Sequence, residues 1–262
     1  MNHSFSAPAK KSLGQHFLAD RYYIDRIVQA VAPRAGQHLV EIGPGQGAIT
    51  FPLLRKHGAL TVIEFDRDLI APLTDAAAPI GALSIIHRDV LSVDFTALAN
   101  GTPIRLVGNL PYNISSPILF HALDHAGAVA DMHFMLQKEV VDRMAAGPGS
   151  KVYGRLSVML QAYCEVTALF VVPPGAFRPP PKVDSAVVRL VPRDPATVLI
   201  KDRRRFAEVV RAGFGQRRKT LRNALSEVCE PAHFEAAQVR PDARAEQLEV
   251  ADFIRLANVE LA

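Results

Sequence analysis

The sequence predicts an α/β protein, in which a doubly wound and largely parallel sheet precedes a small all-helical part. One observation is that short apolar runs typical of strands alternate with runs whose apolar residues recur every three or four positions, as in helices. Such an alternation is typical of βαβ units, whose strands lie parallel in one sheet. The other observation is that the alternation stops around residues 192–198, beyond which only the helical spacing remains.

The composition is typical of a globular protein. Of the 262 residues, 49% are hydrophobic and 21% are charged, which provides a core and argues against disorder. No apolar stretch approaches the roughly 20 residues of a membrane-spanning helix, and the N-terminus lacks the apolar segment of a secretory signal. The two cysteines, Cys164 and Cys229, are far apart, so neither a disulfide framework nor a cysteine zinc site is indicated. We therefore expect a cytoplasmic protein.

The expected elements follow one another from the N-terminus. A first helix begins after Asp20, a suitable N-cap, and ends at Pro33. Five strands are expected at short apolar runs, namely 38–42, 60–65, 83–87, 104–108 and 132–137. Helices are expected between and after these strands, at 46–56, 67–78, 116–126 and 138–146.

The pattern changes in the second half of the chain. The glycine-rich segment 147–155 is expected to be a loop, and a helix is expected after it. Two late strands, 166–172 and 185–191, flank a proline-rich connection. We place the boundary between two domains after residue 195, so that residues 196–262 form the helical domain.

The positive charge is concentrated in the helical domain. Residues 201–222 contain nine basic and two acidic residues, a local charge of +7, whereas the whole chain carries only +4. A basic block beside a near-neutral body is typical of a protein that binds a phosphate backbone. Taken alone, the block could equally be the solvated face of a helix.

A glycine-rich turn follows the first strand. In VEIGPGQG, at 40–47, Gly43, Gly45 and Gly47 let the backbone turn tightly and approach a ligand closely. Dehydrogenases, methyltransferases and plain tight turns all share such a turn. Glu64 ends the next strand, 21 residues after Gly43, where a carboxylate can accept both hydroxyls of a ribose.

A second carboxylate, Asp89, follows the third strand at the same edge of the sheet. One acid for a ribose and another for an adenine amine favour a nucleoside without a pyrophosphate over a dinucleotide. S-adenosylmethionine (AdoMet) is such a ligand. The alternative is that Glu64 and Asp89 are ordinary caps at the ends of strands.

The fourth strand leads into GNLPYNIS, at 108–115. Methylation of an adenine amino group needs a localised lone pair on N6, and acceptors at its two hydrogens favour that geometry. The Asn109 side chain and the Leu110 carbonyl can both accept. Pro111 adds no competing N–H, and Tyr112 can stack on a base. The alternative is a structural turn between a strand and a helix.

These motifs occur in the order and spacing of one known family. Over residues 10–260 the chain resembles the small-subunit (16S) ribosomal RNA adenine-N6,N6 dimethyltransferases, whose loss confers kasugamycin resistance. The resemblance is carried by LGQHFL (13–18), VEIGPGQGAIT (40–50), IEFDRDL (63–69), HRDVL (87–91), GNLPYNISSPI (108–118), FRPPPKVDSAVV (177–188) and FGQRRKTLRNAL (214–225). It implies a Rossmann-like AdoMet-dependent methyltransferase sheet in residues 1–195, with 1–19 as an N-terminal lid segment, and an rRNA-binding helical domain in residues 196–262.

The resemblance also implies roles for particular residues. Tyr112 and Phe177 would sandwich the target adenine, within a catalytic set of Asn109, Leu110, Pro111, Tyr112 and Phe177. The implied AdoMet-binding residues are His16, Leu18, Gly43, Gly45, Glu64, Asp89, Val90 and Asn109. The implied RNA-binding residues are Arg217, Arg218, Lys219 and Arg222. The chain departs from the family at His16, where Asn is common, and at Phe65, where Ile is usual.

The implied function is methyl transfer from AdoMet to N6 of two adjacent adenines near the 3′ end of 16S rRNA during small-subunit biogenesis. We expect no metal, because no carboxylate or cysteine accompanies His121 and His125 in the pattern of a metal site. We also expect a monomer. One alternative is the related 23S rRNA dimethyltransferase of macrolide resistance. Others are a non-catalytic ribosome-assembly factor on the same fold and, more distantly, a DNA adenine methyltransferase.

Overall fold

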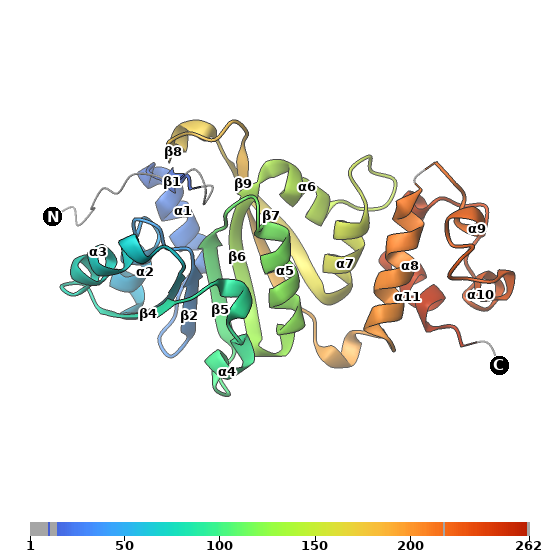
Figure 1. Cartoon of the computed structure of the whole chain (residues 1–262), viewed down its shortest axis with the longest axis horizontal. Helices are drawn as coiled ribbons and strands as arrows, with labels where there is room; N and C mark the ends of the chain where they lie inside the picture. The colour runs from blue at the N-terminus through green and yellow to red at the C-terminus, as the bar shows by residue number, and fades with distance from the viewer. Residues whose placement is uncertain (1–9, 11–14, 217, 261–262) are drawn as a thin grey trace. The chain divides into compact units, whose positions relative to one another are not determined.

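Two compact units make up the chain (Figure 1). The structure is a computed structural model, which describes Lys10 and residues 15–216 and 218–260. The first unit contains most of the sheet, and the second is largely helical. Among the described residues, the first unit consists of Lys10, 15–141 and 167–192, and the second of 142–166, 193–216 and 218–260.

A single sheet of seven strands runs in the order β4-β3-β2-β5-β6-β9-β7. The first five of these strands pair in parallel, and β9 pairs antiparallel with β6. The bounds are His38–Ile42 for β2, Ala59–Glu64 for β3, Ala82–His87 for β4, Ile104–Asn109 for β5, Val129–Gln137 for β6, Cys164–Val172 for β7 and Ser185–Pro192 for β9. The predicted α/β fold is confirmed, and each predicted strand is present with its ends shifted by at most three residues.

Helices cover both faces of this sheet. One face shares an apolar core with the first three helices, to which Leu39, Val62 and Val107 contribute from the strands. Strand residues at alternate positions, such as Val40 and Leu106, are equally buried but lie outside that core. They point to the face that α5 covers, in front of the sheet in Figure 1. The helices are α1 (Arg21–Val31), α2 (Thr50–His57), α3 (Arg67–Ala77), α4 (Phe95–Ala99), α5 (Ser115–Asp124) and α6 (Lys138–Ala145).

The glycine turn delays the start of α2. The sequence predicts this helix from residue 46, whereas it begins at Thr50. Gly45 and Gly47 have φ angles of 56° and 81°, which belong to the left-handed region and are incompatible with a right-handed helix. The chain therefore makes its tight turn first and enters the helix afterwards.

A separate two-stranded sheet ties the start of the described chain to a distant segment. β1 (Phe17–Leu18) pairs antiparallel with β8 (Phe177–Arg178), so that Leu18 lies opposite Phe177. Both of these side chains are buried in the core of the first unit. The sequence did not predict this pairing, because two-residue strands carry no periodicity.

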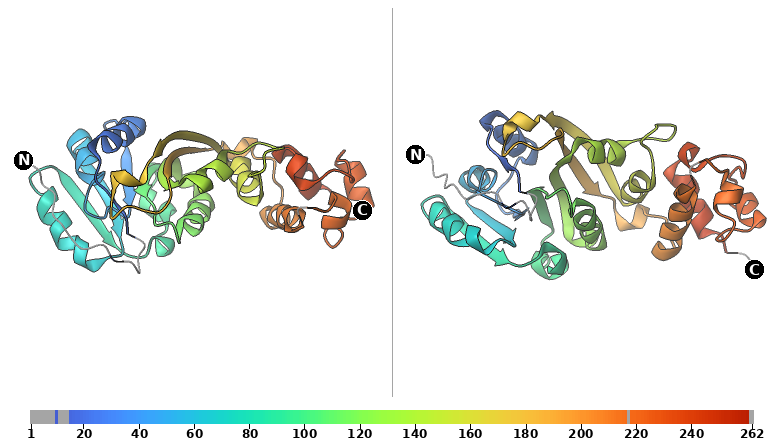
Figure 2. Two further views of the ribbon diagram at one scale, coloured as in Figure 1. Left: turned by 90° about the horizontal axis from the view of Figure 1, so that it is seen from above. Right: turned by 45° about the horizontal axis from the view of Figure 1, so that its top comes forward.

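The second unit is held together by helices (Figure 2). Its core contains Phe206, Leu221 and Phe253, and the rings of Phe214 and Phe253 stack at 5.5 Å. The helices are α7 (Arg155–Tyr163), α8 (Arg203–Gly215), α9 (Leu221–Ala224), α10 (Pro231–Ala236) and α11 (Val250–Asn258). Because α7 belongs to this unit, the unit includes residues that precede the domain boundary predicted from the sequence. The functional domains 1–195 and 196–262 stay a prediction. No helix among the described residues is long and apolar enough to cross a membrane.

A buried ion pair fixes the amino-terminal edge of the sheet. The Arg105 guanidinium donates from Nε and Nη2 to the two carboxylate oxygens of Asp131, both at 2.8 Å. It also donates to the carbonyl of Val31, the last residue of α1, and to the side chain of Gln37, both at 2.7 Å. The pair thus joins β5 and β6 to the end of α1.

We expect Arg105→Met to lower the free energy of unfolding by about 3–5 kcal/mol, because the buried carboxylate of Asp131 loses its bidentate partner and keeps only the half-exposed Arg189, at 3.9 Å. Urea denaturation measures this loss. The control is Arg21→Met, since Arg21 lies 3.9 Å from Asp25 at an exposed site and should change stability by less than about 1 kcal/mol. Similar losses in the two variants would contradict this role of Arg105.

Candidate active site

A cavity of about 300 Å³ opens at the carboxyl-terminal edge of the sheet. The parallel pairing brings the ends of β2, β3 and β5 together here, since parallel strands end at the same edge. Every residue predicted to bind AdoMet lines this cavity, as do all the predicted catalytic residues except Phe177. The residues so placed are His16, Leu18, Gly43, Gly45, Glu64, Asp89, Val90, Asn109, Leu110, Pro111 and Tyr112.

The glycine turn forms one wall of the cavity. Gly43 donates its N–H to the carbonyl of Ile63 at 2.9 Å, which fixes the turn to β3. A Cβ atom on Gly45 would lie 3.0 Å from the ring of Phe17, so the turn and the N-terminal segment pack as closely as a glycine allows. The wall therefore presents backbone, rather than side chains, to a ligand.

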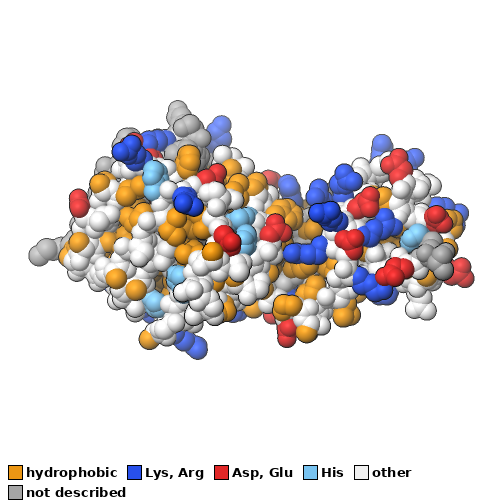
Figure 3. All heavy atoms as spheres, turned by 60° about the horizontal axis from the view of Figure 1, so that its bottom comes forward, with side chains coloured by type: hydrophobic (Ala, Val, Ile, Leu, Met, Phe, Trp, Pro, Cys, Tyr) orange, Lys and Arg blue, Asp and Glu red, His pale blue; other side chains and the backbone are white. Residues whose placement is uncertain are grey.

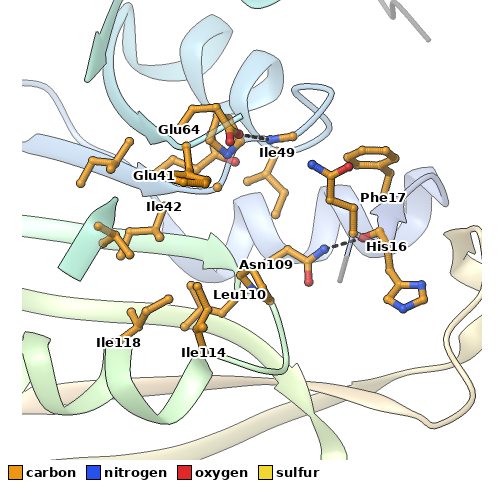
Figure 4. A pocket seen from close by; sticks show the side chains of 18 of the residues that line it. His16, Phe17, Glu41, Ile42, Ile49, Glu64, Asn109, Leu110, Ile114 and Ile118 are labelled. Atoms are coloured by element: carbon orange, nitrogen blue, oxygen red, sulfur yellow. Dashed lines mark hydrogen bonds between the residues drawn. The ribbon is translucent and has the colours of Figure 1, made fainter. Parts of the chain in front are cut away.

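Glu64 is held rigidly at the end of β3. One carboxylate oxygen accepts the N–H of Asp66 at 2.7 Å. The other accepts the N–H of Gly45 at 3.3 Å (Figure 4). Burial raises the pKa of this carboxyl, and the backbone hydrogen bonds act in the opposite direction. A carboxylate has about four lone-pair positions. Both oxygens thus keep a position for the hydroxyls of a ribose.

Asp89 lies at the mouth of the cavity and is exposed. Its Oδ1 accepts the N–H of Leu91 at 3.0 Å and so caps the short 3₁₀ helix Val90–Ser92. Its Oδ2 accepts no hydrogen bond from the described residues. Asp89 is thus a strand-end cap that retains one acceptor oxygen and lines the cavity.

The side chain of Asn109 is oriented by the N-terminal segment. Its Nδ2 donates to the main-chain carbonyl of His16 at 2.9 Å (Figure 4). Because the amide nitrogen is engaged there, the amide oxygen remains as an acceptor at the cavity. The next residue, Leu110, is tied through its N–H to the carbonyl of Met135 on β6, at 3.1 Å.

Tyr112 presents an aromatic ring beside Asn109. Its hydroxyl hydrogen-bonds with Oγ of Ser185 at 2.6 Å, and burial raises its pKa. The ring that faces it is the imidazole of His16, with centroids 5.9 Å apart and planes inclined by 25°. Phe177, the expected second face for a base, has 0% of its side chain exposed and does not line the cavity. Its stacking role stays a prediction that needs a rearrangement.

Glu41 is a cavity residue that the sequence reasoning missed. Its carboxyl is fully buried on β2, burial raises its pKa to about 8, and the nearby Thr50 side chain acts in the opposite direction. Neither Oε2 of Glu41 nor the hydroxyl of Thr50 makes a well-formed hydrogen bond among the described residues. An unpaired buried carboxyl oxygen is costly unless a ligand supplies a donor. The sequence signal that could have predicted this residue is an acidic residue within the apolar strand 38–42.

Two described residues of the N-terminal segment, Lys10 and Gln15, bond to the chain that follows β3. Lys10 Nζ lies 2.5 Å from Asp66 and 2.6 Å from Asp68, and Gln15 donates to Asp66 at 3.2 Å. Asp66 in turn donates its N–H to Glu64. The segment is thus bonded to Asp66, which lies two residues after Glu64, the predicted ribose acceptor. The sequence did not predict this link.

The predicted RNA-binding residues belong to the second unit. Arg218 and Lys219 are exposed between α8 and α9, and Arg222 is exposed on α9, whereas Arg217 lies outside the described residues. Figure 3 shows Lys and Arg side chains gathered over the helical unit.

Comparison with known proteins decides between the families that share such a cavity. Residues 7–260 match the family described as ribosomal RNA adenine dimethylase. The chain belongs to this family. It is therefore a methyltransferase, and AdoMet is its methyl donor. The predicted family, fold, activity and donor are confirmed.

This rRNA adenine dimethylase is similar both to near-identical proteins and to solved structures of lower sequence identity. The ribosomal RNA small subunit methyltransferase A of Xanthomonas axonopodis pv. citri (strain 306) is 96% identical over 262 residues, 100% of both chains. A dimethyladenosine transferase from Plasmodium falciparum is 25% identical, with a TM-score of 0.81 over 92% of this chain and 96% of that one. The 23S rRNA methyltransferase ErmE is 25% identical, with a TM-score of 0.71 over 92% and 98%.

The residues of the cavity fit AdoMet. Glu64 offers acceptors for the ribose, Asp89 offers one for the adenine amine, and the turn at Gly43 leaves backbone exposed for the methionine end. The orphaned oxygen of Glu41 lies at the same wall and suits a donor such as an amine or a water. When bound, AdoMet supplies an electrophilic methyl group on a sulfonium.

We expect Glu64→Gln to weaken AdoMet binding by about 10- to 100-fold, as one to three kcal/mol are lost when a buried group is left mispaired. An amide accepts at one end only, so one of the two ribose hydroxyls would lose its acceptor in the complex. Calorimetry measures the Kd. The control is Asp75→Asn, an exposed acid on α3, and an unchanged Kd for Glu64→Gln would contradict the assignment.

Proposed function

We propose that this enzyme transfers methyl groups to N6 of two adjacent adenines near the 3′ end of 16S rRNA, in the assembling small ribosomal subunit. The observation that carries the proposal is the Asn109 amide, oriented by the carbonyl of His16, beside the ring of Tyr112 at the methyl-donor cavity. The near-identical relatives, which are named small subunit methyltransferases, support the choice of subunit.

The side chains and carbonyls at the end of β5 prepare the amino group. The lone pair of adenine N6 is delocalised into the ring, which makes it a poor nucleophile. The amide oxygen of Asn109 and the carbonyl of Leu110 would accept its two hydrogens and favour a tetrahedral nitrogen with a localised lone pair. Pro111 has no N–H that could compete, and the ring of Tyr112 would hold the base by stacking.

Dimethylation sets a further requirement on this site. After one transfer the amino group keeps a single hydrogen, so only one of the two acceptors still receives a hydrogen bond. The site must also admit the first methyl group when the base is bound again. A strong general base is not needed, because the methylated amine loses its proton readily once it is positively charged.

The helical domain would hold the RNA. We propose that residues 196–262 bind rRNA phosphates, through Arg218, Lys219 and Arg222 together with Arg217. The N-terminal residues 1–19 would act as a lid segment over the AdoMet cavity, and the bonds of Lys10 and Gln15 to Asp66 support this role. The enzyme would act as a monomer in the cytoplasm, where small subunits are assembled.

Two alternatives lead to different experimental results. A 23S rRNA dimethyltransferase is the first, since ErmE shares the fold. Primer extension on both rRNAs after reaction with ribosomal particles would place the methylated adenines, and stops only in 23S rRNA would overturn the proposal. A non-catalytic assembly factor is the second, and binding to immature small subunits without transfer of labelled methyl groups would support it.

We expect Asn109→Ala to lower kcat by roughly 100-fold or more, since removal of one preorganised hydrogen-bonding group from an active site has costs of that size. Binding of immature subunits should be retained. The measurement is transfer of labelled methyl groups to immature small subunits. Gln29→Ala, which removes an exposed amide on α1, is the control, and full activity of Asn109→Ala would exclude the proposed role.

Replacing Arg218, Lys219 and Arg222 together with Ala should weaken subunit binding and reduce its salt dependence. If each side chain neutralises one phosphate, the slope of log K against log salt should fall by about 2. Binding titrations at several salt concentrations test this. Replacing the exposed Arg34, Arg55 and Lys56 in the first unit removes the same charge, so an equal effect there would contradict a local patch.

A further inference from the structure

The hydroxyl of Tyr112 is tied to a strand whose residues do not line the cavity. It hydrogen-bonds with Oγ of Ser185, the first residue of β9, at 2.6 Å. We propose that Ser185 is a positioning residue, which fixes the ring of Tyr112 for stacking on the target adenine. This inference rests on the proposed function and adds to it a residue outside the cavity.

Ser185 is itself held firmly by the sheet. Its side chain is 0% exposed, and it lies opposite Gln137 in the pairing of β9 with β6. The carbonyl of the preceding residue, Asp184, accepts the N–H of Lys138 at 2.9 Å. The hydroxyl of Ser185 is therefore presented to Tyr112 from the end of a paired strand, whose place does not depend on a ligand.

The main chain around Tyr112 is held as well. The carbonyl of Tyr112 accepts the hydroxyl of Ser115, the first residue of α5, at 3.1 Å. The N–H of Leu110, two residues earlier, is bonded to the carbonyl of Met135 on β6. A tyrosine held only at its main chain could still turn about its side-chain bonds. The bond to Ser185 removes this freedom because it fixes the far end of the ring.

The orientation of this ring matters for the transfer. Tyr112 is half-buried and lines the cavity beside Asn109. A base that stacks on a ring takes its plane from that ring, and the amino nitrogen of adenine lies in the plane of the base. The ring therefore sets where N6 points relative to the Asn109 amide and the methyl donor, and small misplacements of reacting groups are costly.

The same bond relates the two residues predicted to sandwich the base. Phe177 on β8 precedes Ser185 by eight residues, and the connection 179–184 leads from β8 into β9. Through Ser185, the segment after β5 is thus joined to the strand that follows β8. The hydroxyl of Ser185 would keep the ring of Tyr112 in place while Phe177 rearranges to reach the base.

A purely structural role is the alternative, because buried hydroxyls are hydrogen-bonded in most proteins. Such a role predicts a loss of stability without a change in kcat. A positioning role predicts instead that Ser185 affects catalysis only through the hydroxyl of Tyr112.

A double-mutant cycle in the full-length enzyme separates the two roles. Ser185→Ala removes one hydroxyl, and Tyr112→Phe removes the other while it keeps the ring. We expect each variant to lower kcat on immature small subunits by about 3- to 10-fold, the range of one net hydrogen bond. The double variant should lose no more than either single variant. The Kd values for AdoMet and for subunits should change by less than about twofold, because the donor contacts and the helical domain stay intact.

Two further variants set the scale of the effect. Ser185→Thr keeps the hydroxyl and should recover most of kcat. Tyr112→Ala removes the whole stacking face and should lose more than Tyr112→Phe, about 5- to 150-fold.

The helical unit offers matched controls. Tyr153, which is 1% exposed, donates its hydroxyl to the carbonyl of Leu248 at 3.0 Å. Ser157, which is 0% exposed, donates its hydroxyl to the carbonyl of Arg143. Neither residue lines the cavity, so Tyr153→Phe and Ser157→Ala should leave kcat unchanged. Urea denaturation verifies that each variant is folded.

Three results would overturn the inference. These are wild-type kcat in folded Ser185→Ala or in Tyr112→Phe, losses that add in the double variant, and an equal loss of kcat in Tyr153→Phe. If Ser185→Ala does not fold, kcat of Tyr112→Phe alone decides, since this variant removes the same hydrogen bond. Absence of methyl transfer by the wild-type enzyme on small subunits would instead refute the proposed function itself.

Discussion

The parallel pairing of β3, β2 and β5 is the constraint on which the site depends. In this register Ile42 lies opposite Ile63, and Glu41 opposite Val107, so the three strands end together. Residues separated by more than twenty positions in the sequence thus meet around one cavity. The glycine turn, Glu64 and Asn109 each lie at a strand end, where the backbone leaves the sheet and its polar groups become available to a ligand.

The N-terminal segment completes what the sheet begins. The carbonyl of His16 orients Asn109, Phe17 packs on Gly45, and Lys10 and Gln15 bond to Asp66. Each of these contacts joins the first described residues to an element that comes much later in the chain. The same short segment therefore packs on the glycine turn of the cavity and orients the amide of Asn109.

Buried polar groups in the first unit differ in how far their hydrogen bonds are satisfied. At the amino-terminal edge, Arg105 and Asp131 satisfy each other and stabilise the fold. At the carboxyl-terminal edge, Glu41 has an oxygen without a well-formed hydrogen bond, and the Glu64 carboxyl accepts backbone N–H groups. His133 on β6, whose Nδ1 lies 3.8 Å from Asp131, also has two buried ring nitrogens without a hydrogen bond among the described residues, so unsatisfied buried groups are not confined to the edge that receives a ligand.

The sequence by itself determined the α/β class, the strands, the glycine turn with its two acids, and the placement of Asn109 to Tyr112 at the end of β5. These features depend on local periodicity and on residue types that indicate a particular backbone conformation. Glycine, for example, is favoured where φ is positive, as in the turn after β2. Only the tertiary structure decided the pairing of β1 with β8, the burial of Phe177, the place of His16 against Tyr112 and the membership of α7 in the helical unit. Each of these depends on contacts between residues far apart in the chain, which leave no periodic pattern in the sequence and arise only when packing brings the segments together.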